Sequence, residues 1–247
     1  MQWSDDAMVL SLRRHGEAAA IVSLLTRDRG RHHGLVHGQG GGRRAALQPG
    51  ACVHVTWRSR LADNLGTVTC EGVASPDPRI LYDRPRLATL SALCAVVDTA
   101  LGEREPAPGL YEGSTALLAA LAEREDWALV YIAWEINLLS VLGFGLDLAR
   151  CAVTGGSDDL AFVSPRTGRA VTREAGLPYA ERLLALPGFL HNPRAWATPD
   201  DLAAGLRLTG HFLERHVYAA RHRPMPSARA RLAASWPGQA GTPPPAP

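Results

Sequence analysis

Residues 20–37, AIVSLLTRDRGRHHGLVH, hold the pattern from which the rest of the fold can be predicted. Two runs of aliphatic and β-branched residues, 20–25 and 31–37, flank the turn-forming Asp28-Arg29-Gly30. Short apolar runs joined by such a turn are typical of an antiparallel hairpin. The stretch therefore predicts two neighbouring strands with a basic turn between them.

Similar runs on both sides of this hairpin extend the β pattern to about residue 74. We expect five strands over residues 8–12, 20–25, 31–37, 52–60 and 66–73, joined by glycine-containing turns. In the fourth run Val53, Val55 and Trp57 alternate with polar residues, which directs Trp57 inward and the other face, with Arg58, outward. Five strands with turns this short indicate a small closed barrel.

The segment Ser75-Pro-Asp-Pro78 ends the β pattern, and helical periodicity follows it. Helices are expected over residues 87–101, 115–122 and 126–142, and another begins at Thr198-Pro-Asp-Asp201, which carries N-terminal capping residues. The sequence therefore predicts an α+β protein. We expect a barrel domain at residues 1–76, a helical domain at 77–235 and a disordered Pro/Gly/Ala-rich tail at 236–247.

Charge is concentrated in the N-terminal quarter of the chain. The net charge of the 247 residues is +2, but residues 13–60 carry +7, because nine arginines there face only Glu17 and Asp28. A directional basic patch indicates nucleic-acid binding more strongly than a high isoelectric point does. Every basic residue is arginine, which also points to a coding bias, so solvated turns are the alternative interpretation of these arginines. The acidic start and the lack of a long apolar run predict a cytoplasmic protein.

Signatures of catalysis are missing from the sequence. There is no GxSxG nucleophile elbow, and a chain without lysine has no GxxxxGK[ST] phosphate loop. The four cysteines never form a CxxC pair, which is typical of buried apolar residues rather than of a metal site. We therefore expect neither enzymatic activity nor a cofactor.

A five-stranded barrel with basic loops is the architecture of the OB-fold, which binds oligonucleotides. Because Trp3 and Trp57 are the only aromatic residues before Tyr82, base stacking should be weak and binding mainly electrostatic. The predicted DNA contacts are the arginines of this segment: Arg13, Arg14, Arg27, Arg29, Arg31, Arg43, Arg44, Arg58 and Arg60.

Several motifs taken together resemble the bacterial recombination mediator family RecO. They are Thr26-Arg-Asp-Arg-Gly-Arg31 with Gly34-Leu-Val-His-Gly38, the helix Trp134-Glu-Ile-Asn-Leu-Leu139 running into Leu142-Gly-Phe-Gly-Leu146, and the end of the chain from His216 to Leu232. The resemblance implies an OB-fold fused to a helical domain that binds single- and double-stranded DNA and anneals strands without chemistry. It also implies docking on the C-terminal tail of single-stranded-DNA-binding protein and, with RecR, the loading of RecA.

One segment departs from the family pattern. Many relatives carry a four-cysteine zinc site after the central helix, and the matching positions here are Cys151, Thr154, Ser164 and Thr167. Hydroxyl groups are poor replacements for the thiolates that hold structural zinc. We expect a degenerate zinc-ribbon-like loop over about 150–170, without metal.

The resemblance also implies a partner site on the helical domain, where basic residues would border an apolar pocket. Arg124, Arg207 and Arg215 are the candidates, and ordinary surface charge is the alternative for each of them. At the level of the whole protein, the alternative to a DNA-annealing mediator is a protein-interaction adaptor that binds DNA only incidentally.

Overall fold

The computed structural model describes residues 1–37, 47–61, 64–192 and 197–236. The chain forms two compact units, one comprising Met1–Trp127 with Pro226–Arg229 and the other Ala128–Met225 with Ala230–Pro247. The division between the units does not coincide with the expected domain boundary at 76/77, because helices that follow this boundary pack with the barrel. The expected tail at 236–247 lies, except for Trp236, outside the described residues.

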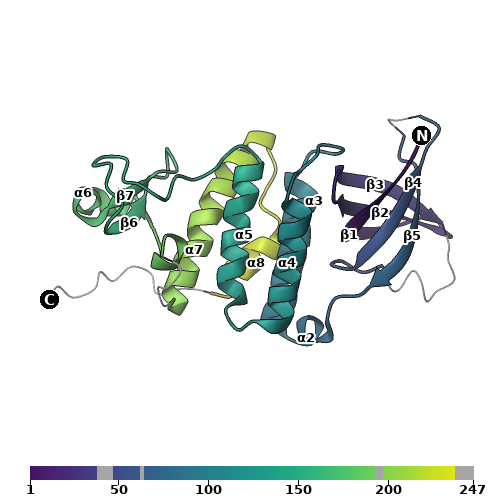
Figure 1. Ribbon diagram of the computed structural model, residues 1–247, viewed down its shortest axis with the longest axis horizontal. Coiled ribbons are helices and arrows are strands. Elements are labelled where there is room, and N and C mark those ends of the chain that lie inside the picture. The colour runs from purple at the N-terminus through teal and green to yellow at the C-terminus, as the bar shows by residue number, and fades with distance from the viewer. Residues whose placement is uncertain (38–46, 62–63, 193–196, 237–247) are drawn as a thin grey trace. The chain divides into compact units, whose positions relative to one another are not determined.

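The first unit contains a closed five-stranded barrel with the strand order β1-β2-β3-β5-β4. Its neighbours pair antiparallel except β3 and β5, which are parallel. This confirms the α+β class with an N-terminal OB-type barrel, whose strands are visible in Figure 1. The strands are β1 (Gln2–His15), β2 (Ala19–Thr26), β3 (Gly30–His37), β4 (Cys52–Arg58) and β5 (Thr67–Ala74).

Strand β1 is much longer than the sequence predicts and closes the barrel. Its first half, from Gln2 to Met8, pairs with β4, whereas its second half pairs with β2. A β-bulge between Val9 and Ser11 shifts the register and therefore changes which residues face inward. Val9 lies in the barrel core before the bulge and Leu12 packs against the core after it, so Arg13 faces outward.

The barrel core is built from aliphatic residues of all five strands together with one indole ring. Trp57 is 3% exposed, as the alternation in the fourth run predicted, and its Nε1 donates to the backbone oxygens of His33 and Leu65. The buried residues of this core are Ala7, Val9, Val22, Leu24, Val36, Leu47, Ala51, Val53, Val55, Trp57 and Val68.

Two helices pack on the outside of the barrel. Helix α3 (Arg84–Ala100), which follows the short α2 (Pro78–Leu81), packs on β1 and β2, and α4 (Leu110–Glu123) packs on β1. Met8 and Leu25 face away from the barrel core but are fully buried. The helices therefore cover one part of the outer surface and leave the rest to solvent.

The second unit combines helices with a small sheet of order β7-β6-β8. Helix α7 begins as predicted, because the Thr198 hydroxyl and the Asp201 carboxylate form a reciprocal capping box. Glu135 on α5 is fully buried and accepts from the hydroxyls of Tyr131 at 2.7 Å and Thr209 at 2.5 Å, which joins α5 to α7. The elements are α5 (Trp127–Val141), β6 (Leu160–Val163), β7 (Ala170–Thr172), α6 (Arg173–Gly176), η1 (Leu177–Arg182), β8 (Leu184–Ala185), η2 (Gly188–Leu190), α7 (Pro199–Phe212), η3 (Leu213–Tyr218), η4 (Ala219–Arg221) and α8 (Ser227–Ala234). Helix α8 is divided between the two units, and the first residue of α5, Trp127, belongs to the first unit.

Among the described helices, none combines the length and the apolar character needed to cross a lipid bilayer.

Candidate nucleic-acid interface

A row of paired residues crosses the outer surface of the barrel from strand to strand. Arg13 pairs with Ile21, Ile21 with Leu35, Leu35 with Thr67, and Thr67 with Arg58. Residues paired in this way share one side of the sheet, and all five are exposed or half-buried. We call these five residues the outer row. It places Arg13 and Arg58 on the outside of the closed barrel, four strand spacings or about 19 Å apart along the sheet, so the row runs most of the way around the barrel.

A shallow hollow of about 640 Å³ adjoins the β4 end of the outer row. It is lined by Leu35, Thr67, Arg58 and Arg60, together with residues of the β4–β5 connection. At the β1 end, Arg14 is exposed next to Arg13. Arg13, Arg14, Arg58 and Arg60 form no ion pair with any residue that the structure describes. These four arginines are therefore available to an anionic ligand.

Arg31 faces outward as well, but it belongs to the part of the barrel that α3 covers. Asp98 of α3 accepts hydrogen bonds from the hydroxyls of Ser11 at 3.0 Å and Ser23 at 2.5 Å. The Arg31 guanidinium lies 3.5 Å from the same carboxylate and donates to the Leu101 oxygen at 3.1 Å. With only 15% of its side chain exposed, Arg31 attaches α3 to the barrel, which leaves little of its charge for DNA.

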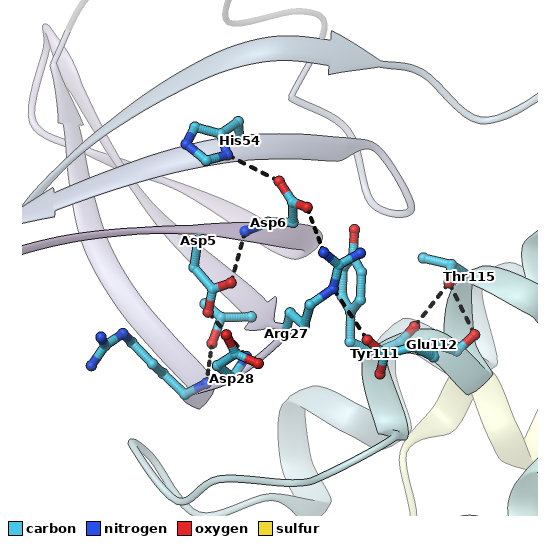
Figure 2. Close-up of polar contacts among 10 residues, drawn as sticks. Asp5, Asp6, Arg27, Asp28, His54, Tyr111, Glu112 and Thr115 are labelled. Carbon is cyan, nitrogen blue, oxygen red and sulfur yellow. Dashed lines mark hydrogen bonds and ion pairs between the residues drawn. The ribbon is translucent and has the colours of Figure 1, made fainter.

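Arg27 is paired with acids on two elements, as Figure 2 shows. Its guanidinium lies 2.9 Å from Asp6 of β1 and 3.1 Å from Glu112 of α4, and it stacks over the Tyr111 ring at 5.0 Å. His54 contacts the other oxygen of Asp6 at 2.9 Å, and this hydrogen bond, assisted by Arg27, holds the pKa of Asp6 below its ordinary value. Arg27 thus links α4 to the barrel.

Arg29, in the same turn, is exposed, and its guanidinium lies over the Trp3 ring at 5.1 Å. Arg43 and Arg44 lie outside the described residues. Among the described arginines, the structure therefore groups Arg58 with Arg60 beside the hollow and Arg13 with Arg14 at the opposite end of the row.

Sequence reasoning did not find Arg104, which follows α3. Its guanidinium donates to the Asn64 oxygen at 2.8 Å and lies 6.0 Å from the Trp57 ring centre. Its backbone has φ 64°, which is rare outside glycine, and its amide N–H donates to the Arg31 oxygen at 2.7 Å. No residue pattern near position 104 indicates that its side chain meets the barrel.

The candidate partner residues occupy different settings. Arg124 is held by Asp126 through two hydrogen bonds of 2.7 and 2.6 Å within the first unit. Arg207 and Arg215 belong to the second unit and are exposed, and Arg215 donates to the Pro165 oxygen at 3.3 Å. Their assignment to a partner site stays a prediction.

The segment that matches the zinc-site spacing is held by backbone hydrogen bonds. Cys151 is 1% exposed, and its sulfur accepts from the N–H groups of Val153 and Thr154, both at 3.4 Å, and Thr172 at 3.3 Å. At the other half of the spacing, the N–H groups of Thr167 and Gly168 donate to the Ser164 oxygen at 3.3 and 2.9 Å. Within the described part of the chain, no three histidine, cysteine or acidic side chains gather so that they could hold a metal ion.

This arrangement predicts a pH-dependent contribution of Cys151 to stability. Burial acts to raise the pKa of the thiol, but the hydrogen bonds from Thr154, Thr172 and Val153 together lower it to about 6. A folded-state pKa below the unfolded value of about 8.5 favours folding above that unfolded value, and the benefit is lost as the pH falls through 6. Urea unfolding of the wild type and Cys151→Ser should show the largest difference near pH 9 and a smaller one near pH 5. A difference in the free energy of unfolding that stays constant over this pH range would contradict the formation of a thiolate at Cys151.

The comparisons with known proteins agree with this architecture. A family model described as the recombination protein O N terminal matches residues 1–76, and one described as the recombination protein O C terminal matches residues 81–224. The chain is 53% identical over 235 residues to the DNA repair protein RecO of Rhodospirillum centenum, covering 94% of this chain and 93% of that protein. It is 51% identical to the RecO of Rhodospirillum rubrum, covering 94% and 95%, and 49% identical to that of Phenylobacterium zucineum, covering 93% and 95%. The chain therefore belongs to the RecO family of DNA repair proteins.

Proposed function

We propose that this protein binds single- and double-stranded DNA along the outer row of its barrel and anneals complementary strands without catalysing a covalent reaction. The observation that carries the proposal is the outer row, with the exposed Arg13 and Arg14 at one end and Arg58 and Arg60 at the other, and with no acid paired to any of them among the described residues. Membership of the DNA repair family RecO supports it.

The mechanism is electrostatic. Arginines that neutralise phosphates release condensed counterions and reduce the repulsion between two strands brought together. The two acids of β1 are already engaged within the protein, because Asp6 is occupied by Arg27 and His54, and the buried Asp5 accepts from the backbone N–H of Asp28. Of the predicted contacts, Arg13, Arg14, Arg58 and Arg60 carry the proposal. Arg29, which is exposed but is not part of the outer row, joins them on grounds of charge, as do Arg43 and Arg44.

The partners follow from the family rather than from the geometry. We propose that the protein acts in the cytoplasm at the nucleoid, docks on the C-terminal tail of single-stranded-DNA-binding protein and works with RecR in loading RecA. An acidic tail requires a basic surface, and Arg207 and Arg215 of the second unit are exposed candidates, with Arg124 already engaged by Asp126.

The test is strand annealing at physiological salt, measured by fluorescence quenching between labelled complementary oligonucleotides. The protein should accelerate annealing of bare strands. It should also accelerate annealing of strands coated with intact single-stranded-DNA-binding protein, but much less when that protein lacks its tail. A protein that binds the tail yet leaves the annealing rate unchanged would be an adaptor, and the proposal would be wrong.

A further inference from the structure

A second, smaller hollow of about 300 Å³ lies where β1 begins and β4 ends. The β2–β3 turn and the connection between α3 and α4 border it, and all of these segments belong to the first unit. It is not part of the outer row. Its chemically distinctive lining residues are Trp3, Asp28, Arg29, His32, Trp57 and Arg104.

One side of this hollow is an aromatic wall. The rings of Trp3 and Trp57 are stacked, with centroids 5.7 Å apart and planes 12° from parallel, and His32 meets Trp3 edge-on at 4.9 Å. Trp57 is anchored in the core, whereas Trp3 is only half-buried. The Trp3 ring is therefore supported by Trp57 and remains accessible for stacking by another flat group.

A planar cationic side chain, that of Arg29, already packs on this ring. The Arg29 guanidinium lies over Trp3, and no acid pairs with it among the described residues. Guanidinium planes and nucleobases both stack on indole rings. The position of Arg29 thus shows that a planar group fits against Trp3, and a side chain without an ion-pair partner can move aside at little cost.

The same hollow carries positive charge. Arg29 and Arg104 contribute two guanidinium groups and Asp28 contributes a carboxylate, while the Glu103 carboxylate lies 3.8 Å from the Arg104 guanidinium and opposes part of its charge. His32 adds no charge near neutral pH, because burial and the nearby Arg104 lower the pKa of its imidazole. An aromatic ring beside two arginines has the chemistry to receive a base together with its phosphate.

The fold tolerates two unfavourable features at this hollow. Arg104 holds φ 64° although it is not glycine, which costs energy in any L-residue with a side chain. His32 is 7% exposed, and its buried Nδ1 has no hydrogen-bond partner among the described residues. Strained backbone and unsatisfied buried polar atoms are uncommon in native proteins and gather at ligand sites.

We propose that this hollow holds one unpaired nucleobase of single-stranded DNA against the Trp3 ring, in the place of the Arg29 guanidinium, with the adjoining phosphate between Arg29 and Arg104. The proposal rests on the proposed DNA-binding function and adds a base-stacking contact to it. It also revises the expectation that binding is purely electrostatic. A paired base has both faces occupied within the duplex, so the contact favours single strands.

The experiment measures the affinity of the full chain for two strands of equal length and charge. One is an oligothymidylate of about 16 nucleotides, the upper site size of an OB-fold, and the other is an abasic sugar-phosphate strand. At matched salt the wild type should bind the base-bearing strand roughly fivefold or more tightly, the lower limit for stacking one base. Trp3→Leu should lose this preference and keep its duplex affinity, whereas Trp3→Phe should retain most of it. Trp236→Leu, in the second unit, is the matched control and should behave as the wild type.

Equal affinity of the wild type for the two strands would overturn the proposal while leaving the proposed function intact. Failure to bind either strand or duplex would instead remove the proposed function, and this inference with it. If Trp3→Leu does not fold, as judged by circular dichroism, photocross-linking of the wild type to 5-iododeoxyuridine decides. An adduct on the peptide containing Trp3 or His32 supports the contact, and adducts confined to other peptides overturn it.

Discussion

Replacing Arg13, Arg14, Arg58 and Arg60 together by glutamine is expected to weaken binding of single-stranded DNA by roughly tenfold or more at physiological salt. The four side chains are exposed and form no ion pair with a described residue, so no ion pair within the described part of the chain is lost with them. Each lost phosphate contact lowers the slope of log affinity against log salt by about 0.7, so the slope should fall by up to about 3. Fluorescence anisotropy over a salt series measures both quantities.

Four other arginines provide a control with the same change in charge. Each is about half exposed and lies within 4 Å of a carboxylate, so its charge is already opposed locally: Arg79 with Asp77, Arg124 with Asp126, Arg169 with Asp147 and Arg173 with Asp159. Both quadruple variants change the net charge from +2 to −2. Equal losses of affinity would mean that overall charge, rather than the outer row, drives binding.

Replacing Gly30 by alanine is expected to destabilise the first unit by roughly 2–5 kcal/mol, from left-handed strain and overpacking combined. Gly30 has φ +69°, and an added Cβ would lie 1.7 Å from the backbone oxygen of Glu105. A backbone atom cannot yield as a flexible side chain does. The β2–β3 turn, the α3–α4 connection or both must then move. The free energy of unfolding in urea is the measurement, against typical totals of about 5–15 kcal/mol.

An alanine variant at Gly16 separates the backbone strain from the overpacking. It has φ +65° in the β1–β2 turn, and an added Cβ would meet no atom within 4 Å. Gly16→Ala should therefore cost only the backbone strain, about 1 kcal/mol. If both alanine variants lost the same stability, close approach of the two segments at Gly30 would not be the cause.

Local patterns in the sequence predicted much of this fold. The Asp-Arg-Gly turn forms the β2–β3 hairpin, Thr198 caps α7 as the motif requires, and Trp57 faces the core as the alternation indicated. The start of β1 was missed, because Gln2 to Asp6 are polar apart from Trp3 and their strand is defined by pairing with β4, some fifty residues away. A non-local partner leaves no period in the segment itself.

The candidate site was predictable as a region but not as individual residues. Arg27 and Arg31 have the same sequence character as Arg29, yet acids from α4 and α3 engage only the first two. These acids lie more than sixty residues away in the chain, so composition cannot separate the structural arginines from the available ones. Arg104 was missed for a related reason, since the backbone conformation that directs its side chain has no sequence signature.

Burial of Met8 and Leu25 by the packing helices bears on how far the barrel can stand alone. A fragment cut after residue 76 would retain all five strands and every arginine of the outer row. It would also uncover these two apolar side chains and leave the hydroxyls of Ser11 and Ser23 without the Asp98 carboxylate that accepts their hydrogen bonds. Such an exposed apolar patch invites self-association, so the isolated barrel should aggregate. A fragment that extends to Trp127 keeps α3 and α4 and lacks only Pro226–Arg229 of the first unit, so it is the better choice for studying DNA binding apart from the rest of the chain.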